Sequence, residues 1–331
     1  MTVPGSLGGL ILARGEVDRV THRRRDEPWL AAAWADPASR VLVADGGKSL
    51  VRINGESAEL VLVPPGEAPD GIRMLLGIGP DGVAYFGVAG PLPDPPLLTW
   101  PLPGDARPGE LVSGRLSGAA AADPAVRPLS LREAAPLLSD RDAGLMTHAV
   151  AVANWHAVFT HCPRCGAVTE PSDAGYARHC PADGSDHFPR VDPAMIVLVT
   201  DHDDRCLLAR NALWPPGRVS ILAGFVEAGE SAEQAVVREV HEEAGLVVDE
   251  VQYLGSQPWP MPQSLMLGFR ARAAAGQEIR VDADEIAEAH WFSRDELTAA
   301  IAAGQWRLPP PVSIAHRIIE SWYGAGLPGA W

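Results

Sequence analysis

Residues 224–246 read GFVEAGESAEQAVVREVHEEAGL, and this stretch predicts a helix with a defined start and end. Ser231, followed three residues later by Gln234, forms a capping-box pattern in which the two side chains satisfy free amides of the first turn. Gly245 is a residue type that ends helices. An apolar stripe between these ends predicts that one helix face is buried; it consists of Ala232, Ala235, Val236 and Val240.

Three glutamates occupy the opposite face of this predicted helix. Glu239, Glu242 and Glu243 are spaced so that their carboxylates lie together. Carboxylates in such a group repel one another unless a cation neutralises them, and hard oxygen ligands suit Mg²⁺ or Mn²⁺, which also bridge to substrate phosphates. A solvated acidic face is the alternative for a Glu-rich helix, but the fixed spacing, with glycine at both ends, favours a metal site.

The stretch matches the pattern G-x5-E-x7-R-E-U-x-E-E-x-G-U, where U is a bulky aliphatic residue, and so resembles the Nudix box of Nudix hydrolases. The resemblance implies metal-assisted attack of water on a pyrophosphate. It makes Glu239 and Glu243 the main metal ligands and Glu242 a further ligand or the general base, and it leaves open which glutamate is the base. It also implies metal binding by the Ala223 carbonyl and by Glu285, for which a solvated carboxylate in an acidic run is the alternative.

A proline-rich segment follows the box: residues 256–264 read SQPWPMPQS. It resembles the SQPWPFPxS signature of NADH pyrophosphatases of the NudC type, with Met261 in place of phenylalanine. Its prolines predict a stiff extended segment that cannot join the interior of a sheet, and Trp259 on such a wall suits a nicotinamide or adenine ring. A surface loop whose tryptophan covers the core is the alternative. The resemblance implies substrate binding by Gln257, Pro258, Trp259, Pro260, Met261, Pro262, Gln263 and Ser264.

A cysteine motif lies upstream, where residues 162–166 read CPRCG and Cys180 follows. Such a knuckle turns two thiolates toward one ion, and NudC-type proteins carry a four-cysteine zinc ribbon at this place. Asp183 stands where the fourth cysteine would be, so the expected Zn²⁺ ligands are Cys162, Cys165, Cys180 and Asp183. His187 or His179 as the fourth ligand, or a ribbon without tightly bound metal, are the alternatives. Cys206 is predicted to be a buried strand residue.

The resemblance carries a few further positions to this chain. Phe188 and Phe225 become candidates for stacking on a base, although core packing explains Phe225 equally well. Arg132 and Ala315 match positions that contact substrate in relatives. Gly175 replaces a family glutamate, so that contact is expected to be absent.

Composition limits the class of protein. The chain has 331 residues, of which 47% are hydrophobic, and it has four cysteines. Three of them belong to the zinc-like cluster, which argues against a disulfide framework and for a reducing compartment. Without an apolar run of membrane-spanning length, the sequence predicts a cytoplasmic protein. A formal charge of −15 disfavours binding along an extended stretch of nucleic-acid backbone. It is still compatible with an RNA end that enters a local basic opening.

The sequence predicts a four-part chain of α/β class. Residues 1–128 are expected to form a small, mainly β N-terminal domain with a Pro/Gly-rich linker at about 90–109. Residues 129–159 are expected to be helical, with a capping box at Ser130, and residues 160–192 to form the zinc-ribbon-like part. Residues 193–331 are expected to form a Nudix α/β/α sandwich around a mixed sheet. Strands are expected at 40–44, 60–63, 195–200, 206–210 and 219–223, a hairpin at 72–76 and 83–88, and helices near Ser293 and Val312.

The combined motifs favour an enzyme that cuts NAD(H) into AMP and nicotinamide mononucleotide with Mg²⁺ or Mn²⁺, and the resemblance adds removal of NAD caps from RNA 5′ ends and a homodimer. One alternative is a Nudix hydrolase that acts mainly on ADP-ribose or another dinucleotide. The other is a Nudix-like nucleotide sensor, which the intact run REVHEEAG disfavours.

Overall fold

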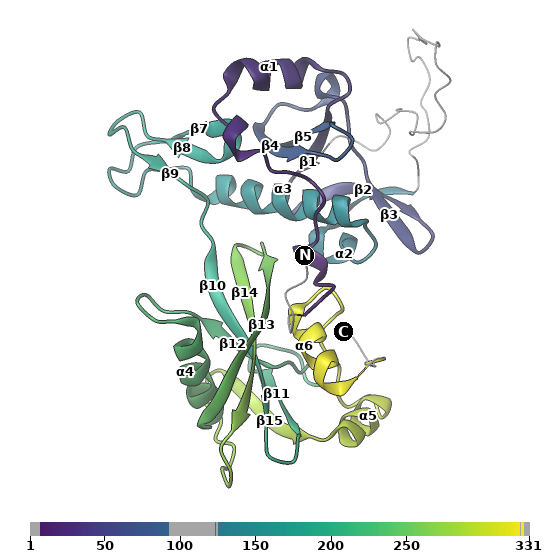
Figure 1. The fold of residues 1–331 in the computed structure, drawn as a ribbon, viewed down its shortest axis with the longest axis vertical. Coiled ribbons are helices and arrows are strands. Elements are labelled where there is room, and N and C mark those ends of the chain that lie inside the picture. The colour runs from purple at the N-terminus through teal and green to yellow at the C-terminus, as the bar shows by residue number, and fades with distance from the viewer. Residues whose placement is uncertain (1–6, 93–122, 124, 325, 328–331) are drawn as a thin grey trace. The chain divides into compact units, whose positions relative to one another are not determined.

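The computed structural model describes residues 7–92, 123, 125–324 and 326–327 and divides the chain into two compact units (Figure 1). One unit comprises residues 15–190. The other joins residues 191–331 to the first 14 residues of the chain. From position 93 onward, the linker predicted at 90–109 lies outside the described residues.

The unit of residues 15–190 contains two small sheets beside the ribbon. The first has the strand order β1 (Arg40–Ala44), β5 (Ala84–Ala89), β4 (Ile72–Ile78), and the second has the order β3 (Ser57–Leu60), β2 (Lys48–Asn54), β6 (Val126–Ser130). Its helices are α1 (Glu27–Ala35), α2 (Leu131–Ala134) and α3 (Asp140–Val158). The antiparallel pairing of β4 with β5 confirms the predicted hairpin.

Two boundaries differ from the prediction in this unit. The strand expected at 60–63 ends at Leu60, and the segment expected to be helical from 129 begins as the last residues of β6. The capping box is nevertheless present: Glu133 and Ser130 satisfy one another's amides at the start of α2. Pairing of β6 with β2 therefore extends the strand up to the cap residue itself.

The ribbon forms a third small sheet in the same unit, with strands β7 (Glu170–Ser172), β8 (Ala177–His179) and β9 (Asp186–His187). Buried Arg178 of β8 donates from Nε to Thr169 Oγ1 at 2.7 Å, and its Nη1 lies 3.1 Å from His156 Nδ1. His156 belongs to α3. This polar network holds the ribbon against α3 and satisfies the buried guanidinium.

The other unit is built on a six-stranded sheet in the order β13, β14, β10, β11, β15, with β12 paired to β10. The strands are β10 (Asp192–Thr200), β11 (Cys206–Asn211), β12 (Leu222–Phe225), β13 (Val248–Trp259), β14 (Ser264–Ala273) and β15 (Ile286–Phe292). The pair β10 and β14 is parallel and the other pairs are antiparallel, so the sheet is mixed, as predicted. Cys206 is a fully buried residue of β11, which confirms its expected place.

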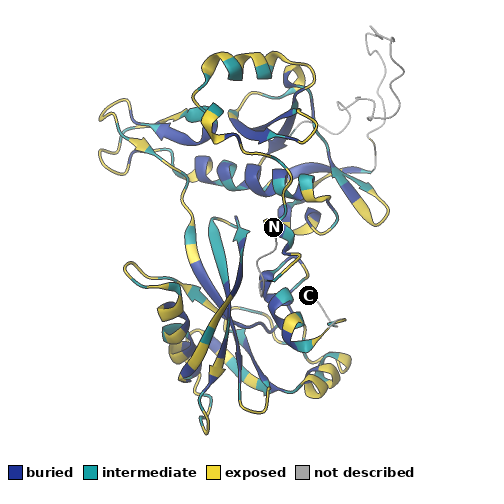
Figure 2. Cartoon of the chain, viewed as in Figure 1, coloured by how far each residue is buried: buried dark blue, intermediate teal, exposed yellow. Residues whose placement is uncertain are grey.

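Helices cover both faces of this sheet. Alternate residues of β10 belong to different hydrophobic cores. Met195 and Val197 share one core with Val236 of α4 (Ala232–Ala244), whereas Leu198 shares the other with Ile318 of α6 (Ile314–Tyr323). Helix α5 (Arg294–Ala302) adds Leu297 to the second core. The burial colours of Figure 2 follow this layering: the central strands β10 and β11 are mostly buried, whereas α4 and α5 carry much exposed surface. The predicted α/β/α sandwich is confirmed.

Residues 7–14 belong to this sandwich and not to the domain that follows them in the chain. The Leu7 amide donates to the Leu254 carbonyl at 2.7 Å, and the Leu12 amide donates to Gln257 Oε1 at 3.4 Å. Among the helices of the described residues, none combines the length and the hydropathy that crossing a bilayer requires.

Candidate active site and zinc site

Helix α4 begins and ends where its caps were predicted. Gln234 N donates to Ser231 Oγ at 3.2 Å, Ser231 N donates to Gln234 Oε1 at 2.9 Å, and Gly245 closes the helix with φ 68°. The buried stripe of this helix packs on the sheet. These contacts fix the rotation of the helix, so that Glu239 and Glu243, one turn apart, lie beside the strand β12.

Glu243 is the most buried carboxylate of the predicted site, with 6% of its surface exposed. Burial, together with the charges of Glu239 and Glu285, raises its pKa to about 8. Its Oε2 atom is buried and has no hydrogen-bond partner among the described residues. A buried carboxylate oxygen without a partner is costly, and a cation would satisfy it.

Glu239 lies against the strand that precedes the box. A β-carbon at Gly224 would overlap the Glu239 carboxylate, so the site needs glycine at the start of the motif. Burial also raises the pKa of Glu239, and the charges of Glu242 and Glu285 add to this effect. Adjacent carboxylates with an unpartnered buried oxygen fit a divalent cation with oxygen ligands, such as Mg²⁺ or Mn²⁺.

The remaining predicted metal ligands are close to this pair, with one difference. Glu285 immediately precedes β15, and Ala223 of β12 contributes a backbone hydrogen bond to Glu243. Glu242 instead has a side chain that is 56% exposed and accepts a hydrogen bond from Arg238 Nη1 at 2.9 Å. The structure therefore brings together Ala223, Glu239, Glu243 and Glu285, and it leaves Glu242 at the solvent edge.

Arg238 organises the site, a role that was not predicted for it. Its guanidinium lies 2.8 Å from Glu230 and 2.9 Å from Glu239, and its Nη2 donates to the Phe225 carbonyl at 2.9 Å. These contacts tie the loop before α4 to the helix. Both Arg238 and Glu230 are defined positions of the motif pattern, so the fixed spacing was the signal that could have identified them.

The proline-rich segment is only partly extended. It forms the end of β13, an edge strand, where Pro258 pairs with Leu265 and Trp259 with Ser264. An edge position agrees with the predicted exclusion from the sheet interior. Beyond Trp259 the prediction of an extended segment is wrong, because residues 260–263 form the turn that leads into β14.

Two glutamines of this segment are engaged within the protein. Gln257 has no exposed surface, and its Nε2 donates to the Val312 carbonyl at 3.0 Å while its Oε1 accepts from Leu12. Gln263 Nε2 donates to Asp192 Oδ2 at 2.6 Å. Trp259 and Met261 are half-buried and keep surface that a ring could contact.

The other candidate residues are distributed over both units. Phe225, at the end of β12, is 60% exposed, and Phe188, after the ribbon strand β9, is 61% exposed. Ala315 is buried in α6, where its amide donates to Ser313 Oγ at 3.2 Å. Arg132 is exposed on α2, and Gly175 adopts φ 87°, a backbone angle that favours glycine.

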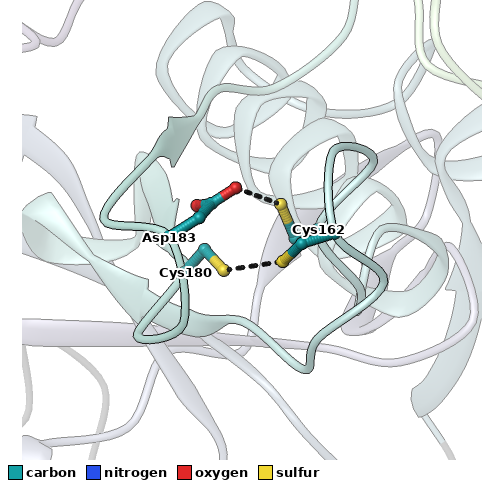
Figure 3. Close-up of side chains that lie close together, drawn as sticks. Cys162, Cys180 and Asp183 are labelled. Atoms are coloured by element: carbon teal, nitrogen blue, oxygen red, sulfur yellow. Dashed lines mark hydrogen bonds between the residues drawn. The ribbon is translucent and has the colours of Figure 1, made fainter.

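The predicted zinc ligands converge in the ribbon. Ligand atoms of Cys162, Cys165, Cys180 and Asp183 all lie within 4.8 Å of one another. Cys162 Sγ is 3.5 Å from Asp183 Oδ2, and Cys165 Sγ is 3.5 Å from Cys180 Sγ (Figure 3). Amides at Gly166 and Gly184 bond back to the carbonyls of Cys162 and Cys180, which folds both knuckles around one point. Three thiolates and a carboxylate fit tetrahedral Zn²⁺.

The two histidines considered as the fourth zinc ligand, His179 and His187, lie at different distances from the cysteines. His179 Nδ1 lies 2.8 Å from Asp186 Oδ1, outside the cluster. His187 Nε2 is 3.3 Å from Cys162 Sγ, and so lies beside it. Burial alone would raise the pKa of Cys162, but hydrogen bonds from the Arg164 amide and Ser185 outweigh it and lower the pKa to about 6. A thiolate at neutral pH is the form that binds metal.

Family comparisons match both motifs. A NUDIX domain model matches residues 190–311, and a model of the NADH pyrophosphatase zinc ribbon domain matches residues 159–188. The chain is 40% identical over 327 residues to the NAD-capped RNA hydrolase NudC of Mycobacterium bovis, with 94% of each chain covered. It is also 42% identical over 197 residues to the NAD-capped RNA hydrolase NUDT12 of Pongo abelii, which covers 56% of this chain and 42% of the relative.

Solved structures give a more distant match. A NUDIX hydrolase from Nitrosomonas europaea aligns with a TM-score of 0.37 and 19% identity, covering 45% of this chain and 97% of its own.

Proposed function

Because this chain belongs to the NudC family of Nudix hydrolases, we propose that it cuts the pyrophosphate of NAD(H) into AMP and nicotinamide mononucleotide and removes NAD caps from RNA 5′ ends. The observation that carries the proposal is the carboxylate cluster on α4. It combines an unpartnered buried oxygen on Glu243 with an intact motif around it. An isolated acidic helix face would leave its carboxylates in water and would not raise the pKa of one of them to about 8.

We assign the metal-binding role to Glu239, Glu243, Glu285 and the Ala223 carbonyl. Mg²⁺ or Mn²⁺, when bound, offsets the charge of the pyrophosphate and activates water. Arg238 holds the Glu239 carboxylate in place through the contact at 2.9 Å. Glu242, at the solvent edge of the cluster, is the carboxylate with room to accept a proton from water, and we assign it the role of general base.

The base of the dinucleotide is proposed to lie against the segment from Gln257 to Ser264. Trp259 and Met261 supply the ring contact, and the prolines and Ser264 keep the wall stiff. Gln257 contributes by holding β13 to Leu12 and Val312, since its amide is fully buried. Phe225, at the exposed end of β12, completes the substrate contacts proposed for this unit.

Zinc has a structural role in this proposal. The cluster of Cys162, Cys165, Cys180 and Asp183 closes the ribbon and has no open position, which is typical of structural zinc sites. None of the four cysteines is in a disulfide, as expected of a reducing compartment, so we propose a cytoplasmic location. A homodimer, which the family resemblance implies, is part of the same proposal, and light scattering of the purified protein tests it.

Product analysis tests the function. Purified protein with Mg²⁺ or Mn²⁺ is offered NADH, NAD⁺, ADP-ribose and NAD-capped RNA, and products are separated by chromatography. We expect AMP and nicotinamide mononucleotide from NAD(H), and RNA with a 5′-monophosphate from the capped substrate. Preferred cleavage of ADP-ribose would contradict the assignment. Because Glu243→Gln alters only the cluster, it serves as the control for contaminating pyrophosphatases.

A further inference from the structure

A basic cavity lies in the same unit as the carboxylate cluster, outside the residues assigned above. It has a volume of about 320 Å³ and is lined by Pro215, Pro216, Gly217, Arg218, Gly304, Gln305 and Arg307. None of these lining residues is acidic, although Asp and Glu outnumber Lys and Arg by 42 to 27 in the whole chain. Two cations without an acid in the lining favour an anion as the occupant.

The two arginines are held side by side by the backbone. Arg218 and Arg307 are partners in an isolated parallel bridge, in which the Val219 amide donates to the Arg307 carbonyl at 3.1 Å and the Arg307 amide donates to the Gly217 carbonyl at 2.7 Å. Arg307 is exposed, and within the described part of the chain its side chain takes part in no hydrogen bond or ion pair. The exposed Arg307 guanidinium is therefore available to an anion, and guanidinium groups suit phosphate oxygens.

The loop that carries Arg218 starts at the carboxylate cluster. The Ala212 amide donates to the Glu285 carbonyl at 2.8 Å, which anchors the beginning of the loop beside a proposed metal ligand. Arg218 also precedes Ala223 by five residues, so their α-carbons are at most ~18 Å apart. Leu213, on the same loop, is 92% exposed, and Trp214 is half-buried. An aromatic side chain such as Trp214 on the loop of a basic cavity suits single-stranded nucleic acid, whose bases stack on aromatic rings.

We propose that this cavity binds a backbone phosphate of the RNA attached to the dinucleotide, a few nucleotides from the bond that is cut. The inference rests on the proposed function and extends it from the cap to the polynucleotide. NADH has no such phosphate and gains nothing from the cavity. A phosphate monoester, such as the 2′-phosphate of NADPH, shares the same chemistry and is the competing source.

Kinetics with matched substrates test the inference. Arg218→Gln, Arg307→Gln and the double variant are compared with Arg272→Gln, which removes an exposed arginine of β14 whose ion pair with Glu250 spans 3.8 Å. We expect each cavity variant to lower kcat/KM for NAD-capped RNA by roughly 3- to 10-fold at low salt, with NADH and NADPH unchanged. The slope of log kcat/KM against log salt for capped RNA should fall by ~0.7 per arginine. Arg307→Lys should restore part of the loss.

Other outcomes overturn the inference. An equal loss on NADH would mean that the arginines support the fold or the cluster, and a loss confined to NADPH would identify the 2′-phosphate as the occupant. Direct binding of uncapped RNA, measured by fluorescence anisotropy, separates this inference from the proposed function because it needs no turnover. Weaker binding by Arg307→Gln supports the basic cavity even in a protein that fails to cleave NADH, and unchanged binding contradicts it.

Discussion

Two carboxylates should account for most of the catalysis. We predict that Glu239→Gln or Glu243→Gln lowers kcat by at least ~10²- to 10³-fold, because each change removes a charged oxygen ligand from a site that must hold a divalent cation next to a polyanion. The fold should persist, since the glutamine keeps the volume of the side chain. Steady-state rates with NADH at saturating Mg²⁺ are the measurement.

Glu233→Gln is the matched control, because Glu233 is an exposed residue in the first turn of the same helix. Its rate should equal that of the wild type. Near-normal rates in both cluster variants would place the metal ligands elsewhere.

Trp259 should set the preference for the dinucleotide. Trp259→Ala removes a ring contact worth ~1–3 kcal/mol, by analogy with bases stacked on aromatic side chains. The loss should fall on NADH more than on ADP-ribose, because ADP-ribose lacks the nicotinamide and the carboxylate cluster is unchanged. The measurement is the ratio of kcat/KM for the two substrates, and Met261→Phe should keep or raise it. An unchanged ratio in Trp259→Ala would make this tryptophan a packing residue.

The sequence predicts the positions of some of these side chains but not of others. Helical spacing was enough to bring Glu239 and Glu243 to one place, because they lie one turn apart on a capped helix. The same spacing could not show that Glu242 turns to Arg238, since that depends on a side-chain choice at the solvent edge. Nor could it show that Gln257 is fully buried, because its partners Leu12 and Val312 are distant in sequence.

The ribbon offers the sharpest test among the structural elements. We predict about one zinc per chain in purified protein, and loss of both metal and soluble yield in Cys162→Ser, because the knuckles have little apolar core to hold them. Asp183→Ala should lower zinc content more than His187→Ala, since Asp183 and the three cysteines form one compact cluster. Metal analysis by mass spectrometry gives the ratio.

Asp186→Ala is the control for this comparison, because its carboxylate pairs with His179 at 2.8 Å and lies outside the cluster. A larger loss in His187→Ala than in Asp183→Ala would make the imidazole the fourth ligand. Protein that contains no zinc without ever meeting a chelator would contradict a closed metal site.

Elements with local signals were predicted well. The capping boxes at Ser130 and Ser231 and the hairpin of 72–76 and 83–88 depend on neighbours close in sequence, and the structure contains all of them. The strand expected at 219–223 is instead β12, Leu222–Phe225, because its pairing with β10 decides its ends. Ser220 instead bridges to Ala209 of β11, and the Val219 amide bonds to the Arg307 carbonyl; both partners are distant in sequence, so no local pattern predicts them.

The whole molecule shows one arrangement that no window of sequence could reveal. Residues 7–14 complete the sandwich formed by residues from the far end of the chain. The four-part division at 128, 159 and 192 therefore stays a proposal about sequence modules, whereas the compact units in the structure follow long-range hydrogen bonds. Because each unit has its own hydrophobic core, each can unfold in its own transition.

A distinct unfolding transition for each unit permits a test of the metal site, because the stability of its unit can be measured against pH. In protein dialysed free of Mg²⁺ and Mn²⁺ with zinc retained, the Glu243 pKa of about 8 lies above its ordinary value. A carboxyl whose pKa is raised by folding stabilises the folded state fully at pH values below its pKa in the unfolded chain. That stabilisation is lost as the pH rises through its pKa in the folded protein. We predict that the unit of residues 191–331 loses at most ~1.4 kcal/mol per pH unit between about pH 4.5 and 8.

The physical reason is that folding resists the negative charge on a buried, unpartnered oxygen, so an unfolded chain releases the proton more easily. Glu243→Gln has no proton to lose there; its transition should be flatter with pH and more stable than the wild type at pH 8. Adding Mg²⁺ or Mn²⁺ should stabilise the wild type most at high pH, where the carboxylate is available to bind, and should leave the variant nearly unaffected. Thermal scans across the pH range measure both effects, and identical pH profiles for the wild type and Glu243→Gln would show that this carboxylate is solvated in the metal-free protein.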